Sequence, residues 1–168
     1  DQLHALWLEA KALGVAQPNI GLLTDMIACP GGDYCALANA RAIPIASAIT
    51  ERYQDLDELH DLGHIDFHIS GCINSCGHHH SGHIGILGVD KDGKEWYQVT
   101  LGGSDGSLAS GESQPGKVVG PSFSAAEVAD VIEAVLETYR HERQHAGDKY
   151  ETFIQTLRRV GLDPFKAA

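Results

Sequence analysis

The chain lacks any long hydrophobic run. No apolar stretch approaches the ~20 consecutive residues that a membrane helix needs, and no signal-peptide pattern is present. These absences argue against a membrane protein, and we expect a cytoplasmic location. The sequence begins at Asp1 rather than Met, which predicts a fragment or a processed product.

Basic residues are scarce. Lys and Arg together number 12 against 23 Asp and Glu, which gives a formal net charge of −11. No basic stripe is available to neutralise phosphates, so binding to nucleic acid is not expected. The same balance argues against docking on anionic membranes, and an acidic electron donor would not be attracted to this surface.

Cysteine is also sparse, with only 4 residues in the chain. Disulfide scaffolds are usually smaller, secreted and denser in cysteine, so two structural disulfides are the less favoured alternative. The cysteines form two close pairs: Cys29 and Cys35 are spaced C-x5-C, and Cys72 and Cys76 are spaced C-x3-C. Four thiolates on short glycine-rich segments are typical of an iron–sulfur site, which indicates electron transfer.

The pattern around the first cysteine pair predicts mostly helix. Helical spacing of apolar residues predicts a helix over 3–13, and a mostly apolar run predicts a short strand over 20–28. Asp33 is expected to cap a helix that starts at Tyr34 and continues through 36–42, which would place Cys35 at the positive end of the helix dipole. Pro44 is expected to kink this helix or to open a second one, whose apolar face continues to Tyr53.

The remainder of the chain predicts strands followed by helices. A strand is expected over 65–70, followed by a hairpin of strands 83–89 and 95–101 and a long loop over 102–116. The capping box of Ser124 and Glu127 is expected to open a helix that is broken at Gly147. A last helix is expected from Tyr150 to near Gly161. This order indicates a single α+β domain, with a mixed β-sheet and flanking helices.

The segments 28–35 and 71–77 read Ala-Cys-Pro-Gly-Gly-Asp-Tyr-Cys and Gly-Cys-Ile-Asn-Ser-Cys-Gly. Together they resemble the sirohaem-dependent sulfite and nitrite reductase hemoproteins, and the likeness continues through the hairpin and the C-terminal helices. Members of that family are much longer and built from two related halves. The resemblance implies that residues 1–168 are the C-terminal cluster- and sirohaem-binding domain of a longer reductase, with 1–19 a linker or helix from the preceding domain.

The resemblance also implies the roles of individual residues. Cys29, Cys35, Cys72 and Cys76 would ligate a [4Fe–4S] cluster, and Cys76 would also bridge to the sirohaem iron. Gly77 would let the backbone approach the cluster, and Asn74 would fix the loop or simply favour a turn. Gly102 and Gly103, with the Ser-rich loop after them, would border the sirohaem or form a plain surface loop.

The family binds its anionic substrate in a cage of Arg and Lys residues, mostly from the N-terminal half. The basic residues here are scattered and match no such cage, so we expect no catalytic residue within this chain and no complete catalyst. The implied partners are the N-terminal half of the same reductase and an electron donor, either a flavoprotein subunit or ferredoxin. The sequence does not choose between sulfite and nitrite.

Four histidines, at positions 78, 79, 80 and 83, follow the second cysteine pair. Cysteine and histidine together can hold zinc, so a zinc-stabilised binding module without a redox role is the alternative function. The C-x5-C spacing lies outside the usual range for structural zinc sites, which favours the cluster. We expect these histidines to pack near the cofactor or to face solvent.

Overall fold

The structure, a computed structural model, describes residues 2–167, with the side chain of Ala146 outside the description. Its main body is a five-stranded sheet in the order β1-β2-β3-β4-β5. The strands are β1 (Ile27–Ala28), β2 (Phe67–Ser70), β3 (Ile84–Lys91), β4 (Lys94–Leu101) and β5 (Lys117–Phe123), and β6 (His145–Ala146) and β7 (Lys149–Tyr150) form a separate hairpin. The helices are α1 (Gln2–Ala12), α2 (Ile43–Arg52), α3 (Leu56–Leu62), α4 (Ala125–Glu142), α5 (Phe153–Val160) and α6 (Asp163–Ala167), with one 3-10 turn, η1 (Gly31–Asp33).

The sheet is mixed, as predicted. β1, β2 and β3 run parallel to one another, and β3, β4 and β5 are antiparallel. β3 and β4 are joined by the two residues Asp92 and Gly93, whose φ angles of 56° and 74° are those of a tight hairpin turn. The predicted strand over 65–70 and the predicted hairpin are therefore confirmed.

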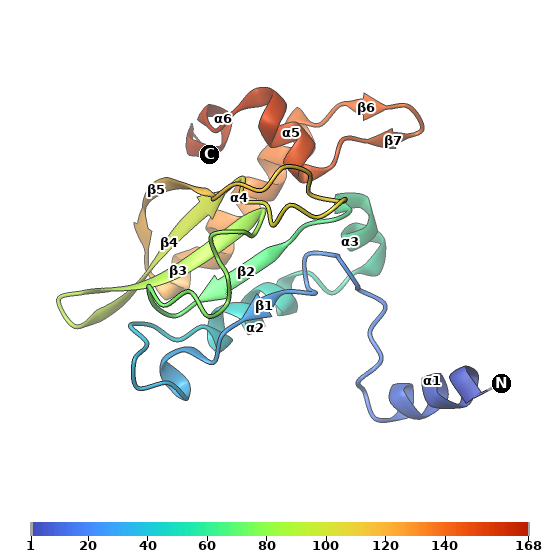
Figure 1. Cartoon of the computed structure of the whole chain (residues 1–168), viewed down its shortest axis with the longest axis horizontal. Helices are drawn as coiled ribbons and strands as arrows, with labels where there is room; N and C mark the ends of the chain where they lie inside the picture. Colours follow the sequence, from blue (N-terminus) through green and yellow to red (C-terminus); the bar gives the residue numbers. More distant parts are fainter. Residues whose placement is uncertain (1, 168) are drawn as a thin grey trace.

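The core lies between the sheet and α4, which crosses one face of it (Figure 1). Alternate residues of the central strands are fully buried, as the period of a strand with one covered face requires: Phe67, Ile69, Ile84, Ile86, Val99 and Leu101. α4 meets them with its buried apolar stripe of Val128, Ile132, Val135, Leu136 and Tyr139. Burying this much apolar surface is the main driving force for the fold.

Two predicted helix starts are confirmed. Pro44 lies in the first turn of α2, where its missing amide proton costs nothing, and Ile45 and Ile49 of this helix are buried. At the start of α4 the carboxylate of Glu127 accepts a hydrogen bond of 2.8 Å from the amide of Ser124. This contact gives an acceptor to one of the orphan donors that every helix N-terminus leaves.

The helix predicted from Tyr34 through residue 42 is wrong. The segment is a 3-10 turn followed by irregular turns, and Cys35 is therefore not in the first turn of a helix. The amides of Asn39 and Ala40 both donate to the carbonyl of Gly71, over 2.9 Å and 3.0 Å. A helix would direct these amides to carbonyls four residues earlier in the same segment, so long-range hydrogen bonds override the local helix propensity here.

Two predicted element bounds are also wrong. The expected strand over 20–28 shrinks to β1, because Asn19, Leu22 and Asp25 form successive hydrogen-bonded turns before it. α4 ends at Glu142, and Gly147 instead occupies the turn of the β6–β7 hairpin with a φ of 70°. Tyr150 accordingly lies in β7 rather than in the last helix, which spans Phe153–Val160 and ends at Gly161 as predicted.

The elements that the sequence did not predict are α3, β5, α6 and the small hairpin. The predicted first helix is present as α1, but none of its residues is buried, and it stands away from the sheet at the end of an extended connection (Figure 1). Its apolar residues Leu3, Leu6 and Trp7 are all exposed. Within the described part of the chain, every helix is too short or too polar to cross a membrane.

Candidate iron–sulfur site

The two cysteine pairs lie in neighbouring loops. β1 carries the chain into Cys29, and β2 carries it into Cys72. β1 and β2 are parallel neighbours in register, with Ala28 opposite Ile69. Parallel strands end at the same edge of a sheet, so the two loops emerge side by side.

Hydrogen bonds tie the two loops together. The amide of Cys29 donates to the carbonyl of Ile69 over 3.0 Å. The amide of Gly71 donates to the Sγ of Cys29, also over 3.0 Å. The carbonyl of Gly71 accepts the amides of Asn39 and Ala40 from the segment that follows Cys35. Gly71, the residue before Cys72, is thus bonded to both sides of the first cysteine pair.

The loops approach each other at glycine. A Cβ on Gly71 would lie 2.6 Å from the carbonyl oxygen of Ala40 and 2.9 Å from the Cα of Gly31. A Cβ on Gly77 would lie 2.0 Å from the carbonyl oxygen of Ile69. Real Cβ atoms do not come this close to backbone, so glycine is required at both positions for the loops to pack as they do.

The backbone of the second loop is tightly wound. The amide of Ser75 donates to the carbonyl of Cys72, and the amide of His78 donates to the carbonyl of Ser75. Ser75 and His78 have φ angles of 56° and 54°, in the left-handed region that non-glycine residues seldom adopt. Such strain is concentrated at functional sites, which supports a role for this loop beyond connection.

All four thiols are free, so the disulfide alternative is not realised. Cys72 is buried, Cys29 and Cys35 are half-buried, and Cys76 is exposed. Three large apolar side chains within two residues of a cysteine are strongly exposed: Tyr34 at 81%, Leu37 at 72% and Ile73 at 80%. Exposed apolar groups gathered around free thiols are typical of a surface that another group covers.

The other residues predicted to meet a cofactor lie in different settings. Gly77 is buried between the loops, and Asn74 is exposed. Gly102 and Gly103 are buried, and a Cβ on Gly103 would lie 2.4 Å from the carbonyl oxygens of His80 and Gly82. The 102–103 turn therefore packs against the segment that follows Cys76.

The histidines after Cys76 divide into two groups. His78 and His80 are exposed, whereas His79 and His83 are fully buried. Burial lowers the pKa of His79 to about 4, with smaller contributions from His80 and His68, so its imidazole is neutral near pH 7. Its Nδ1 lies 3.1 Å from the Oγ of Ser75, which anchors the ring to the cysteine loop. Its buried Nε2 has no hydrogen-bond partner in the described structure.

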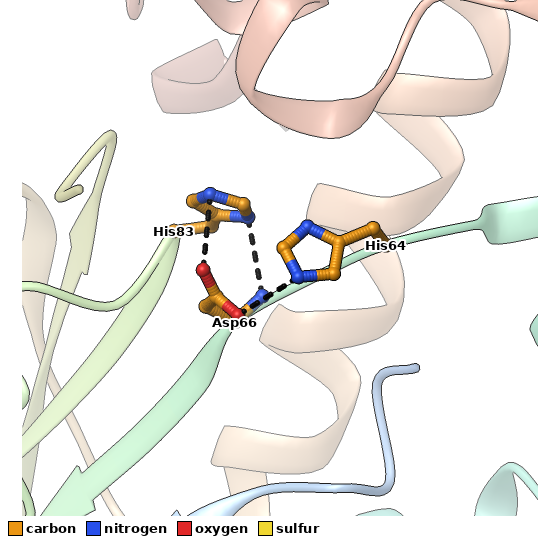
Figure 2. Close-up of side chains that lie close together, drawn as sticks. All are labelled: His64, Asp66 and His83. Atoms are coloured by element: carbon orange, nitrogen blue, oxygen red, sulfur yellow. Dashed lines mark hydrogen bonds and ion pairs between the residues drawn. The ribbon is translucent and has the colours of Figure 1, made fainter. Parts of the chain in front are cut away.

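The described residues contain one group of three metal-type ligands within 4.8 Å of one another: His64, Asp66 and His83 (Figure 2). Two ligand sulfurs on one zinc ion must lie within about 4.6 Å of each other, because each Zn–S bond is about 2.3 Å. None of the four cysteines belongs to such a group in the described chain. Among the residues that the structure describes, the cysteines therefore do not form a preassembled zinc site.

A cavity of about 470 Å³ lies elsewhere, between β5, α4 and α6. It is lined largely by apolar residues, among them Val119, Val131 and Phe165, and by no cysteine. It is separate from the candidate site.

Sequence reasoning missed one contributor to the site. Gly31 brings the first loop against the second with a φ of 61°, and the carbonyl of Ala40 receives the amide of Gly32. The Gly-Gly pair at 31–32 was the available signal, because paired glycines mark a tight turn rather than the start of a helix. Sequence reasoning also missed Asp66, which belongs to the separate group with His64 and His83, because it lies within the run over 65–70 that alternates like an ordinary strand.

Comparison with known proteins agrees with this geometry. The protein family described as "Nitrite and sulphite reductase 4Fe-4S domain" matches residues 22–168. An assimilatory-type sulfite reductase of Nitratidesulfovibrio vulgaris is 30% identical over 114 residues, which are 67% of this chain and 47% of that protein. The hemoprotein beta-component of the NADPH sulfite reductase of Bacillus velezensis is 28% identical over 156 residues, which are 91% of this chain and 25% of that protein.

Solved structures show the same fold. The Mycobacterium tuberculosis NirA protein superposes with a TM-score of 0.74 and 25% identity over 97% of this chain and 30% of its own. A dissimilatory sulfite reductase superposes with a TM-score of 0.65 and 17% identity over 82% of this chain and 49% of its own. The chain spans between 22% and 47% of the curated relatives that it matches. It belongs to the nitrite and sulphite reductase 4Fe-4S domain family.

Proposed function

We propose that the chain is the cluster-binding domain of a sulfite or nitrite reductase hemoprotein, with Cys29, Cys35, Cys72 and Cys76 as the ligands of one [4Fe–4S] cluster. The observation that carries this proposal is the bonding of Gly71 to both sides of the first cysteine pair, which holds four free thiols in adjacent loops. Thiolates are the usual ligands of such clusters, and N–H donors to sulfur adjust their reduction potential. Gly71 supplies one such donor, to Cys29.

The exposure of Cys76 supports its assignment as the bridge to sirohaem. Of the four thiols it is the one in an exposed residue, as a ligand shared with a second group must be. Asn74, Gly77, Gly102 and Gly103 are proposed to border that group, since Asn74 is exposed beside Cys76 and the 102–103 turn packs on the segment after it. When bound, sirohaem would supply the iron at which the anion is reduced.

The reaction of the whole protein is then the six-electron reduction of sulfite to sulfide, or of nitrite to ammonia. The relatives include enzymes of both names, so the substrate stays open between them. The anion site is proposed to lie outside this chain. Five of its arginines, at 41, 52, 140, 143 and 159, pair with carboxylates in the described structure, which leaves fewer cations to hold an anion.

The relatives are much longer than this chain, so its partners are proposed to include the rest of such a reductase. The remainder of a longer reductase would supply the anion site, and a flavoprotein subunit or ferredoxin would supply electrons. We assign α1 and the connection after it to the contact with that remainder, because α1 exposes Leu3, Leu6 and Trp7 and buries no residue against the sheet. The cytoplasm is the compartment proposed for such a reductase.

Anaerobic reconstitution of the chain with ferrous iron and sulfide tests the cluster assignment. The wild-type protein is expected to turn brown with a broad visible absorption band. Cys29→Ser, Cys35→Ser, Cys72→Ser and Cys76→Ser should each lose most of that absorption, whereas Ile73→Ser, at an exposed position inside the second loop, should keep it. A colourless wild-type protein with four titratable thiols would contradict the proposal. One tightly bound zinc per chain, in protein purified without chelator, would favour the zinc module instead.

A further inference from the structure

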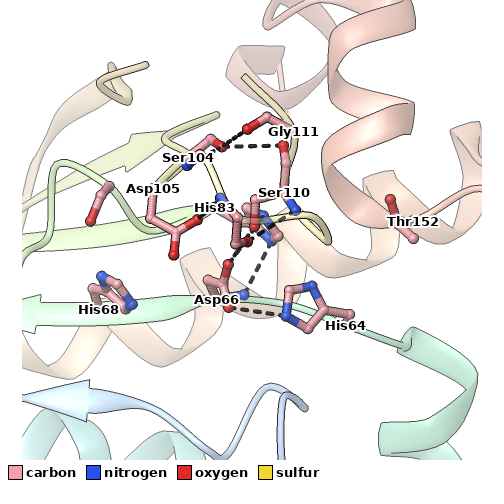
Figure 3. A network of polar contacts seen from close by, with 12 residues as sticks. His64, Asp66, His68, His83, Ser104, Asp105, Ser110, Gly111 and Thr152 are labelled. Atoms are coloured by element: carbon pink, nitrogen blue, oxygen red, sulfur yellow. Dashed lines mark hydrogen bonds and ion pairs between the residues drawn. The ribbon is translucent and has the colours of Figure 1, made fainter. Parts of the chain in front are cut away.

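A second cluster of polar side chains lies away from the cysteines. His64 and Asp66 precede β2, and His83 precedes β3, so the parallel pairing of these strands brings them together (Figure 2). Ser110, from the long loop over 102–116, completes the cluster (Figure 3). The cysteines do not contribute to it, so it needs an explanation of its own.

The contacts of His83 fix its tautomer. The imidazole is fully buried, and its Nδ1 accepts a hydrogen bond of 3.1 Å from the amide of Asp66. A neutral imidazole that accepts at Nδ1 carries its proton on Nε2. That nitrogen lies 3.0 Å from the Oγ of Ser110 and 3.3 Å from the Oδ2 of Asp66. Ser110 in turn donates to the same Oδ2 over 2.8 Å, which closes a ring of three residues.

This tautomer excludes a metal centre, although the ligand types of His64, Asp66 and His83 suit one. A metal on Nε2 of His83 would move the proton to Nδ1, where it would face the N–H of Asp66. Two donors would then oppose each other in a buried position, at a large cost.

The same tautomer excludes a serine nucleophile. For His83 to act as the general base for Ser110, its Nε2 would have to be unprotonated and its Nδ1–H would have to donate to a carboxylate. Here Nε2 bears the proton, and the carboxylate of Asp66 lies on the Nε2 side. The hydrogen-bonded ring of Asp66, His83 and Ser110 therefore has a structural rather than a catalytic role. We call these three residues the clamp.

The clamp holds the turn at Gly102 and Gly103 from two sides. The amide of Gly102 donates to the carbonyl of His83 over 2.9 Å. On the other side the Oγ of Ser104 donates to the carbonyl of Ser110 over 3.1 Å, and the side-chain amide of Gln114 donates to the carbonyl of Gly102 over 3.0 Å. His83 thus reaches the turn through its own backbone and, by way of Ser110, through its side chain.

Without these contacts the loop has little to order it. It is rich in Gly and Ser, and its one large apolar side chain, Leu108, is fully exposed. A loop of this kind gains no burial of apolar surface to offset the entropy of ordering it. The polar contacts with Asp66 and His83 fix it together with the pairing of Ser104 with Gln114 and the hydrogen bond from Arg158 to the carbonyl of Glu112.

We propose that Asp66, His83 and Ser110 are positioning residues, which lock the Gly102–Gly103 turn in the shape that the tetrapyrrole requires. The role in cofactor binding depends on the function proposed above. The locking of the turn does not, because it rests only on contacts within this chain.

Ser110→Ala opens the ring while leaving Asp66 and His83 in place, and Ser113→Ala, at an exposed position in the same loop, is the matched control. In the folded chain, Ser110→Ala should raise amide exchange across 102–114 at least about tenfold, and Ser113→Ala should leave it unchanged. Nitrogen NMR should find the proton of His83 on Nε2 in the wild type. Unchanged exchange in Ser110→Ala, or a proton on Nδ1, would overturn the proposal. Binding of one Zn²⁺ per chain that His64→Ala abolishes would also overturn it, in favour of a metal site.

The rate of sirohaem release distinguishes a positioning role of the clamp residues from a general loss of stability. Ser110→Ala should release sirohaem several-fold faster and shift its visible spectrum, with an unchanged iron content. Tyr139→Phe, which loses hydrogen bonds to the carbonyls of Leu62 and Glu151 and none to the 102–116 loop, should change neither. An unchanged release rate in Ser110→Ala would refute the cofactor role. If the wild-type chain forms no cluster and takes up no sirohaem, the proposed function fails, and the exchange and NMR results still decide whether the turn is locked.

Discussion

The amide of Gly71 donates a hydrogen bond of 3.0 Å to the Sγ of Cys29, 42 positions earlier in the chain. The carbonyl of the same residue holds the segment after Cys35, and Cys72 follows it directly. The backbone of one residue thus fixes the relative positions of both cysteine pairs. The geometry of the candidate site depends on this residue more than on any other that is not a ligand.

Gly71→Ala should abolish cluster assembly. The added Cβ would press on the carbonyl of Ala40 and on the Cα of Gly31, which are backbone atoms that cannot move aside cheaply. Iron per chain after reconstitution should fall at least about fivefold. Gly32→Ala is the matched control, since its Cβ would meet first the flexible side chain of Arg41, at 3.3 Å, and it should retain most of its iron. Normal iron content in Gly71→Ala would show that the close approach of the loops is not required.

Tyr97→Phe should loosen the first cysteine loop. The hydroxyl of Tyr97 donates to the carbonyl of Arg41 over 2.9 Å, and leaving that acceptor without a partner should cost about 1–3 kcal/mol. Tyr139→Phe should cost a similar amount, because its hydroxyl lies 2.8 Å from the carbonyl of Glu151 and 3.1 Å from that of Leu62.

The two variants should differ in how fast a chelator removes iron. Tyr97→Phe should lose iron several-fold faster than wild type, and Tyr139→Phe at the wild-type rate. Equal rates in the two variants would mean that the Arg41 contact does not support the cysteine loop.

Acid should destabilise the fold through His83. Burial lowers its pKa from an ordinary value of 6.5 to about 4. The charges of Asp66 and Asp105 oppose this shift, and those of His64 and Arg158 add to it. The unfolded chain therefore binds this proton first as the pH falls, so stability is lost between about pH 6.5 and pH 4. At about 1.4 kcal/mol per pKa unit, the loss is at most about 3–4 kcal/mol.

Denaturant unfolding at a series of pH values measures this effect. His83→Gln should flatten the dependence between pH 6.5 and 4, whereas His141→Gln, at an exposed position, should not. If His83→Gln does not fold, NMR titration of His83 in the wild type replaces it, with a midpoint expected near 4. An undiminished slope in His83→Gln, or a midpoint near 6.5, would contradict the buried neutral state.

Cys76→Ser tests the bridge in protein that carries both cofactors. Replacing the shared sulfur should abolish the magnetic coupling between cluster and haem iron, which electron paramagnetic resonance and Mössbauer spectra detect. Ser75→Ala, one residue away, should keep the coupling. Retention of normal coupling in Cys76→Ser would refute the assignment of this residue as the bridge.

Much of the fold was predictable from local patterns. The hairpin, the strand before Cys72 and the helix that starts at Ser124 follow from apolar alternation, a two-residue turn and a capping box, all of which act within a few residues. The segment after Cys35 was not predictable in this way. Its alanines favour helix, but its amides bond to Gly71 more than 30 positions later, and no local pattern records that contact.

The candidate site was predictable in part. The spacing of the cysteines predicts the candidate ligands, but it does not predict that β1 and β2 deliver both pairs to one edge of the sheet. The ring of Asp66, His83 and Ser110 carried no signal, because its members come from three separate segments and each resembles an ordinary polar residue. Only the pairing of β2 with β3 and the path of the long loop bring them together.

The central claim is that the four cysteines hold one four-iron cluster. Native mass spectrometry of the anaerobically reconstituted chain tests it most directly, because it weighs the intact protein with its bound atoms. We expect a mass increase equal to four irons and four sulfides, absent from each Cys→Ser variant. An increase equal to one zinc or two irons, or a full cluster that survives loss of Cys29 or Cys35, would contradict it.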